Sequence, residues 1–180
     1  FGVWPQLITN PAFPWRGRSR RPPRDPINAC LSFGYTILSQ WVESAVLGVG
    51  LLRGVGALHQ PGAGRAALVF DLVEEFRAPV VDRTVLRLVN RSQIAPEDFV
   101  DPAWMRPSFP APAPGQSAGF AACSSGAVYL GSASRQLLLR ELLAVSRATL
   151  TDADDGAKIN TRWLLDRQAR RAARLFEGKE

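Results

Sequence analysis

Apolar residues recur every three or four positions through residues 25–50, a spacing that predicts one long helix with a buried stripe. Asp25 can cap the start of this helix, and Pro26 suits its first turn because that position needs no backbone donor. Gly48 and Gly50 mark its end, since glycine readily adopts the conformation that terminates a helix.

The same periodicity predicts shorter helices over residues 66–77, 79–92, 132–149 and 156–177. Pro79 is expected to break the second helix from the third, because proline lacks an N–H and clashes with the preceding turn. A short β-hairpin near residues 119–130 is the most strand structure that the pattern allows. The expected fold is therefore mostly α, a single helical domain of about five main helices.

Residues 1–24 follow no such period and contain several arginines but no acidic residue. Prolines interrupt the stretch "WRGRSRRPPRDP", so that stretch cannot form the interior of a helix. We therefore divide the chain into an extended basic arm over residues 1–24 and a helical domain over residues 25–180.

Composition narrows the class of protein. With 180 residues, 46% of them hydrophobic, the chain is expected to fold around a core. A formal net charge of +6 favours a polyanionic partner such as nucleic acid. No apolar run reaches the about 18 residues of a membrane span, and two distant cysteines suit a reducing cytoplasm better than a disulfide framework. Because position 1 is Phe, we expect a piece of a longer protein.

The one histidine, His59, precedes a predicted helix whose polar side is acidic. Asp71 and Glu74 lie three positions apart on that helix and are neighbours on its surface. Carboxylates suit Mg²⁺ or Mn²⁺, and an imidazole favours Mn²⁺. The alternative is a solvated acidic face beside a structural histidine, which is the commoner use of such residues.

Five stretches of the chain together resemble the catalytic domain of the CRISPR-associated adaptation integrases, the first-numbered family of Cas proteins. They are "RSRRPPRDPINACLSFGYTIL", "GLLRGVGALH", "GRAALVFDLVEEFRAPVVDR", "VLRLVNRSQIAPEDF" and "TRWLLDRQARRAARLFEG". These stretches occur in the order and at the spacing of the family, and they cover about half of the chain. Their combination is specific, whereas any one of them alone would be a weak signal.

The resemblance implies a metal site made of one histidine and two glutamates. His59 and Glu74 match the catalytic ligands, and Asp71 matches a ligand or near-ligand of some branches. The first glutamate of the family lies upstream, in a helix of which residues 1–8 resemble the remnant. Tyr35 and Asn28 match family positions in the long helix and are expected near the site.

The reaction that the resemblance implies is metal-dependent transesterification, in which a short DNA fragment is inserted into the CRISPR repeat; the same site can nick DNA with water. The implied cofactor is Mg²⁺ or Mn²⁺. The implied partners are double-stranded DNA, as spacer fragment and as repeat, a second copy of the chain, and a small ferredoxin-like companion adaptation protein. The implied location is the prokaryotic cytoplasm, with no membrane partner.

Two groups of arginines are candidates for contact with DNA phosphates, one in the arm and one in the last predicted helix. They are Arg16, Arg18, Arg20, Arg21, Arg24, Arg167, Arg170, Arg171 and Arg174. A solvated basic surface, or pairing with nearby acids, is the alternative for each group.

Two other functions stay open. One is a non-catalytic DNA-binding fragment that lacks the upstream glutamate. The other is a basic helical scaffold unrelated to CRISPR, for which DNA binding would be insensitive to salt or absent.

Overall fold

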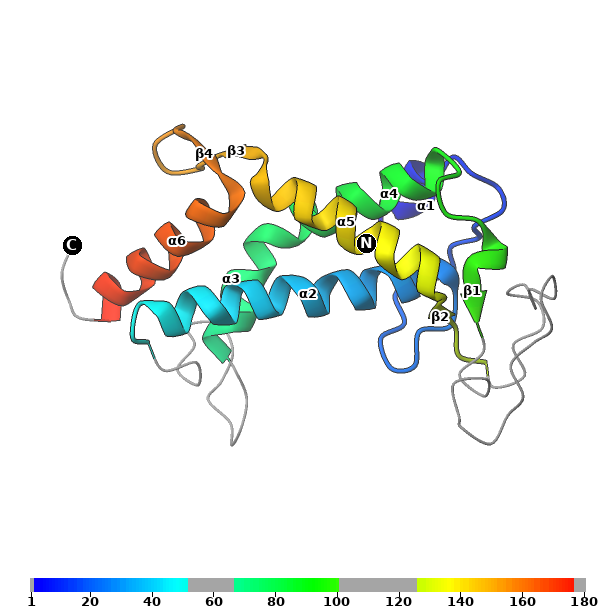
Figure 1. Ribbon diagram of the computed structural model, residues 1–180, viewed down its shortest axis with the longest axis horizontal. Coiled ribbons are helices and arrows are strands. Elements are labelled where there is room, and N and C mark those ends of the chain that lie inside the picture. Colours follow the sequence, from blue (N-terminus) through cyan, green and yellow to red (C-terminus); the bar gives the residue numbers. More distant parts are fainter. Residues whose placement is uncertain (1, 52–66, 101–125, 177–180) are drawn as a thin grey trace. The chain divides into compact units, whose positions relative to one another are not determined.

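The computed structural model describes residues 2–51, 67–100 and 126–176. Its helices are α1 (Trp4–Leu7), α2 (Pro26–Gly48), α3 (Ala67–Phe76), η1 (Arg77–Asp82), α4 (Arg83–Asn90), η2 (Pro96–Asp98), α5 (Ser132–Arg147) and α6 (Thr161–Phe176) (Figure 1). Its strands are β1 (Phe99–Val100), β2 (Tyr129–Leu130), β3 (Thr149–Thr151) and β4 (Lys158–Asn160). The mostly α fold class is confirmed.

Helix α2 begins where the sequence predicts. The Asp25 carboxylate accepts a hydrogen bond of 2.8 Å from the backbone N–H of Asn28, as an N-cap residue does. Pro26 opens the helix, and the helix ends at Gly48, followed by Gly50 at φ +80°.

The expected break at Pro79 is wrong. Helix α3 continues into the π-helical stretch η1, which contains Pro79, and then into α4. In an α-helix the proline ring would meet the carbonyl of the preceding turn. The wider π turn shifts the hydrogen-bond register by one residue, so the chain passes the proline without leaving the helical path.

Two antiparallel strand pairs replace the single expected hairpin. Strand β2 pairs with β1, Phe99 opposite Leu130, whereas residues 119–123 lie outside the described residues. Strands β3 and β4 form a second hairpin, with Thr149 opposite Asn160. Residues expected to start the last helix form this hairpin instead, and α6 starts at Thr161.

The chain divides into two compact units, and the first comprises Phe1–Gly34 and Asp82–Arg140. The basic arm contributes to its core: Trp4 and Phe13 are buried. The Phe13 ring meets Phe99 edge to face at 6.3 Å between centroids. Arm residues therefore pack into this unit, while the domain boundary after residue 24 stays a prediction.

The second unit comprises Tyr35–Val81 and Glu141–Glu180. Its buried side chains come from α2, α3, η1, α5 and α6 at helical spacing, which is what each predicted apolar stripe requires. They include Leu38, Val42, Val46, Val73, Phe76, Val81, Leu142, Leu164 and Leu165. No helix of the described segments combines the length and apolar character needed to cross a membrane.

Candidate functional site

Glu74 lies on the solvent side of α3, and its side chain is 53% exposed. Both carboxylate oxygens lie 2.6 Å from Nη1 of Arg77, one turn further along the helix. The Arg77 guanidinium lies 4.5 Å from the centre of the Tyr35 ring. The structure thus links Glu74 and Tyr35, two of the predicted site residues, through Arg77, whose spacing from Glu74 allows an ion pair.

The contacts of Arg77 hold it in the charged form. Burial alone would lower the pKa of Arg77, but the hydrogen bonds with Tyr35 and Glu74 outweigh burial and raise it above its ordinary value. The Arg77 side chain is 15% exposed, so the aromatic face and the carboxylate replace most of its hydration. The Tyr35 ring thus restrains Arg77, and Arg77 in turn restrains the Glu74 carboxylate.

The other predicted ligands are Asp71 and His59. Asp71 is half-buried and precedes Glu74 by three residues on α3, so the two lie on neighbouring turns. His59 lies outside the described residues. Within the described ranges, no group of three or more His, Cys, Asp and Glu side chains is placed to hold a metal ion. The joint site of His59 and Glu74 therefore stays a prediction.

Glu75, which follows Glu74, belongs to a different environment. Burial raises its pKa above the ordinary value, and the negative charges of Asp154 and Asp152 raise it further, against the charge of Arg171. Glu75 thus interacts electrostatically with the acidic turn between β3 and β4. The sequence pattern did not indicate this neighbourhood.

The raised pKa of Glu75 predicts a pH-dependent gain from Glu75→Gln. A carboxyl whose pKa rises on folding destabilises the folded state wherever it is ionised, so the variant is expected to be more stable at pH 7. The gain should stay within about 1 kcal/mol because the side chain is only partly withdrawn from water, which screens its charge. It should shrink as pH falls and vanish below the unfolded pKa. Thermal melts of both proteins from pH 7 to pH 4 test this; an equal gain at all pH values would contradict it.

Two of the predicted DNA-binding arginines of α6 are engaged in ion pairs. Arg171 Nη1 lies 2.9 Å from Asp152 Oδ1 and 2.7 Å from Asp154 Oδ2. Arg167 Nη1 lies 3.2 Å from Asp152 Oδ2, and Arg167 also pairs with Asp155. The hydrogen bond from Arg171, helped by the charges of both guanidiniums, lowers the pKa of Asp152, whose side chain is fully covered. These two arginines therefore fasten the β3–β4 turn to α6.

The other two arginines of α6 in that group are more exposed than Arg167 and Arg171. Arg170 and Arg174 are exposed, and they lie four residues apart on the solvent face of α6. One sequence signal could have separated the paired arginines from the exposed ones. The acidic run at 152–155 supplies carboxylates for only some of the arginines of the next helix.

Arg18 in the arm is held internally as well. Its Nη1 donates to Asn28 Oδ1 at 2.7 Å and its Nη2 donates to Ser32 Oγ at 3.2 Å. Asn28 is fully buried, and its amide nitrogen donates to Gly17 O at 2.8 Å and to Asp25 Oδ2 at 2.6 Å. Asn28 therefore fastens the arm to the start of α2 within the first unit.

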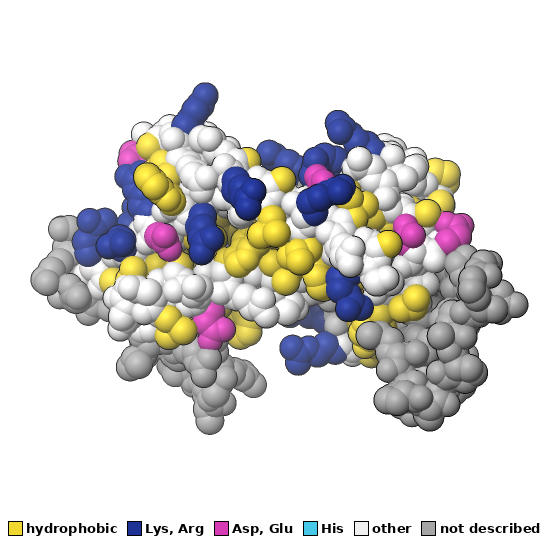
Figure 2. Space-filling model, viewed as in Figure 1, with side chains coloured by type: hydrophobic (Ala, Val, Ile, Leu, Met, Phe, Trp, Pro, Cys, Tyr) yellow, Lys and Arg dark blue, Asp and Glu magenta, His cyan; other side chains and the backbone are white. Residues whose placement is uncertain are grey.

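The other arm arginines are solvent-accessible. Arg16, Arg20, Arg21 and Arg24 are exposed, and two of them border a cavity of about 550 Å³ in the first unit. That cavity is lined by Pro14, Arg16, Gly17, Arg18, Ser19, Arg24, Asp25 and Gly126. Figure 2 shows that Lys and Arg side chains are spread over the visible face, with hydrophobic side chains between them. The exposed arm guanidiniums are the ones able to meet a phosphate.

The sequence of the chain is similar to known proteins of one family. The family model described as "CRISPR associated protein Cas1" matches residues 1–104. The chain is 52% identical over 101 residues to CRISPR-associated endonuclease Cas1 2 of Rhodospirillum rubrum. This match covers 55% of the chain and 29% of that relative, so the two share only part of the relative's length.

Solved structures share the fold at low sequence identity. A Cas1 protein from Thermotoga maritima matches with a TM-score of 0.77 and 23% identity, over 97% of this chain and 47% of that one. A casposase bound to integration product matches with a TM-score of 0.76 and 19% identity, over 98% and 47%. A partial Cas6-RT-Cas1–Cas2 complex matches with a TM-score of 0.72 and 24% identity, over 98% and 46%. The chain spans about half the length of these proteins.

Proposed function

The chain belongs to the Cas1 family, and from this we propose that it forms part of a metal-dependent DNA endonuclease and integrase of CRISPR spacer acquisition. The observation that carries the proposal is the family match over residues 1–104, which contains His59, Asp71, Glu74 and the arm arginines. The relative from Rhodospirillum rubrum is named a CRISPR-associated endonuclease, which supports the reaction class. The casposase of the same fold was solved bound to integration product, which supports strand transfer.

The proposed metal ligands are Glu74, His59 and Asp71. Their carboxylate and imidazole groups are the donors that Mg²⁺ and Mn²⁺ accept, and the 53% exposed Glu74 carboxylate is open to solvent. When bound, such an ion supplies Lewis-acid stabilisation of charge on the phosphodiester oxygens and makes the attacking oxygen more nucleophilic. The residues of the chain contribute position: Arg77 restrains Glu74, and the Tyr35 ring restrains Arg77.

The proposed reaction is an exchange of phosphodiester bonds. The 3′-hydroxyl of a DNA fragment attacks a phosphorus atom of the repeat, the new P–O bond forms, and the 3′-oxygen of the cut strand leaves with a proton. With water as nucleophile the same geometry hydrolyses the strand. As partners we propose double-stranded DNA, a second copy of the chain and the companion adaptation protein; the solved Cas1–Cas2 complex with the same fold supports the last.

The exposed arm arginines are expected to set the affinity for DNA. Charge reversal at Arg16, Arg20 and Arg21 should weaken duplex binding more than tenfold at moderate salt, because each guanidinium neutralises a phosphate and releases counterions. The slope of log affinity against log salt should fall by roughly 0.9 for each phosphate that the variant no longer neutralises. Fluorescence anisotropy over a series of salt concentrations measures both quantities.

A matched control lies in the same unit. Arg91 is exposed at the end of α4, outside the arm, so Arg91→Glu should change the salt slope little. An arm variant with the slope of the unaltered protein would show that the arm does not contact DNA. Arg18 is left unaltered in this test because its guanidinium bonds to Asn28.

A further inference from the structure

The turn between β3 and β4 holds more carboxylates than its arginine partners need for neutrality. Asp152 pairs with both Arg167 and Arg171 of α6. Asp154 adds a second carboxylate to Arg171, with Oδ2 at 2.7 Å from Nη1. Asp155 adds a second carboxylate to Arg167. Among the described residues, three negative charges of the turn therefore face two positive charges of α6.

The three carboxylates differ in what they do for the turn. The Asp152 side chain is fully buried and accepts the backbone N–H of Asp154 at 3.0 Å, so it anchors the turn. Asp155, whose side chain is 43% exposed, accepts the backbone N–H of Ala157 within the turn. The Asp154 side chain is 63% exposed and, in the described part of the chain, pairs with Arg171 alone. Because water screens such an exposed pair, the stability of the turn does not explain this carboxylate.

The two paired arginines belong to a longer row on α6. Arg167, Arg170, Arg171 and Arg174 follow one another at intervals of three or four residues over seven positions, so they lie on one side of the helix. Arg170 and Arg174 are exposed. We call these four residues the α6 stripe. The acidic turn therefore occupies two of its members and lies beside the other two.

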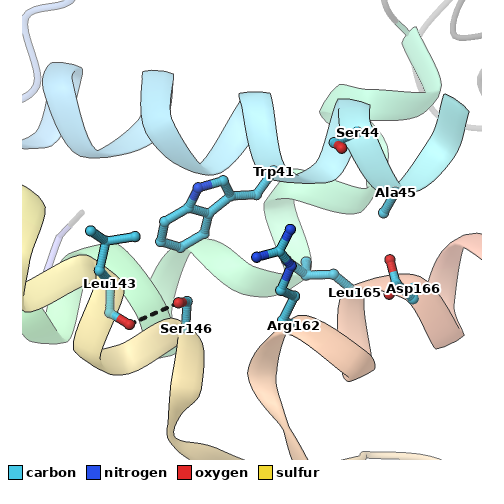
Figure 3. Close-up of a pocket in the computed structure, with 8 residues that line it drawn as sticks. All are labelled: Trp41, Ser44, Ala45, Leu143, Ser146, Arg162, Leu165 and Asp166. Atoms are coloured by element: carbon cyan, nitrogen blue, oxygen red, sulfur yellow. Dashed lines mark hydrogen bonds between the residues drawn. The ribbon is translucent and has the colours of Figure 1, made fainter. Parts of the chain in front are cut away.

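Another arginine of α6 lies away from this stripe. Arg162 precedes Arg167 by five residues, which places it about 140° further round the helix. In Figure 3 its side chain points toward the Trp41 indole of α2, in a small pocket that Asp166 also lines. The acidic turn thus acts on the α6 stripe and not on every cation of the helix.

We propose that the outer carboxylates of the turn, Asp154 and Asp155, form an autoinhibitory contact that limits the affinity of the α6 stripe for DNA. The proposal rests on the proposed function, which makes DNA the partner. Carboxylates and phosphates accept the same parallel N–H donors of a guanidinium, so the two compete for it directly. The outer carboxylates also repel a phosphate that approaches Arg170 or Arg174, because charges closer than about 10 Å are only partly screened at 0.1 M salt.

The contact is separable from the fold of the hairpin. Asn160 Nδ2 donates to Arg147 O at 2.8 Å, and Thr161 Oγ1 donates to Val145 O at 2.9 Å. These bonds fasten the end of β4 and the start of α6 to the end of α5 without the outer carboxylates. A phosphate can therefore displace the Asp154 side chain by rotation about its own bonds while the hairpin stays in place.

The test is Asp154→Asn, which keeps the shape of the side chain and removes its charge. Its affinity for a blunt DNA duplex should rise about threefold to eightfold at 0.1 M salt, because Arg171 becomes free to neutralise one more phosphate. The slope of log affinity against log salt should steepen by up to about 0.9 for the same reason. Fluorescence anisotropy of the full chain over a series of salt concentrations measures both quantities.

Two further variants separate the contact from a simple change of net charge. Glu97→Gln removes one exposed carboxylate from η2 in the first unit, so it should change the salt slope little. Arg171→Gln keeps an N–H donor for Asp152 but removes the cation, so Asp154→Asn should give no gain when combined with it. If Arg171→Gln unfolds below the assay temperature, the comparison of Asp154→Asn with Glu97→Gln decides by itself.

The outcomes distinguish this contact from the function on which it rests. Unchanged affinity and slope in Asp154→Asn would overturn the autoinhibitory contact alone and leave the turn a structural anchor. An equal gain in Glu97→Gln, or a gain that survives Arg171→Gln, would also overturn it, since net charge would then explain the result. Failure of the unaltered protein to bind the duplex would instead overturn the proposed function.

Discussion

Replacing Glu74 by Gln is expected to lower the rate of metal-dependent DNA cleavage by about a thousandfold or more. The substitution keeps the shape of the side chain but removes the charge that an Mg²⁺ or Mn²⁺ ligand needs. Ion-assisted stabilisation of a transition state supplies several kcal/mol, and each 1.36 kcal/mol is tenfold in rate, so roughly three powers of ten are at stake. Nicking of a supercoiled plasmid in the presence of Mn²⁺ measures the loss.

The neighbouring residue supplies the control for this prediction. Glu75 is also exposed on α3 but interacts with Asp154 and Asp152 of the β3–β4 turn. Glu75→Gln should therefore keep nearly full activity. If Glu74→Gln cleaved as fast as the unaltered protein, the proposed metal ligand would be wrong. If both variants were inactive, the loss would be explained by a general effect of the charge on α3 and not by the loss of a specific metal ligand.

Asn28→Ala is expected to lower the free energy of unfolding by about 3–5 kcal/mol. The side chain is fully buried and bonds to Arg18, to the Ser19 N–H, to Gly17 O and to the Asp25 carboxylate. Each buried polar group left without its partner costs about 1–3 kcal/mol, and alanine leaves several. Urea unfolding measures the change, and the melting temperature should fall by about 10 °C for a chain of this size.

A nearby hydrogen bond at the surface separates this effect from a general weakening of the arm. Ser19 Oγ accepts the backbone N–H of Arg24 at 2.9 Å in an exposed position, where water can replace the serine. Ser19→Ala should therefore cost less than about 1.5 kcal/mol. Similar losses for Ser19→Ala and Asn28→Ala would contradict the assignment of Asn28 as the residue that fastens the arm.

The helices could be predicted because their cause is local. Apolar spacing placed α2 within two residues at each end, with Asp25 as its cap. Pro79 misled the prediction because the rule that proline breaks a helix holds for α turns, whereas the chain uses a π-helical stretch there. The β3–β4 hairpin was missed because residues 149–160 contain a polar, acidic turn without a clear alternation of apolar positions.

The candidate site was predictable only in part, because its contacts join distant segments. The motif "DLVEEF" predicted Glu74 as a ligand, and the spacing of three residues allowed an ion pair with Arg77, but the sequence did not indicate that Arg77 would also contact the Tyr35 ring. Likewise the arginines of α6 look alike in sequence. The acidic run at 152–155 indicates that some of them are paired, and the fold shows that these are Arg167 and Arg171, whereas Arg170 and Arg174 are exposed.

Titration of the protein with Mn²⁺ in the presence of a DNA duplex tests the proposed metal-dependent function most directly. Cleavage should be absent in EDTA and rise to saturation with Mn²⁺. The same titration of Glu74→Gln should show weaker Mn²⁺ binding together with the loss of cleavage. Full cleavage in EDTA, or unchanged Mn²⁺ affinity in an active Glu74→Gln variant, would contradict a metal ion held by Glu74.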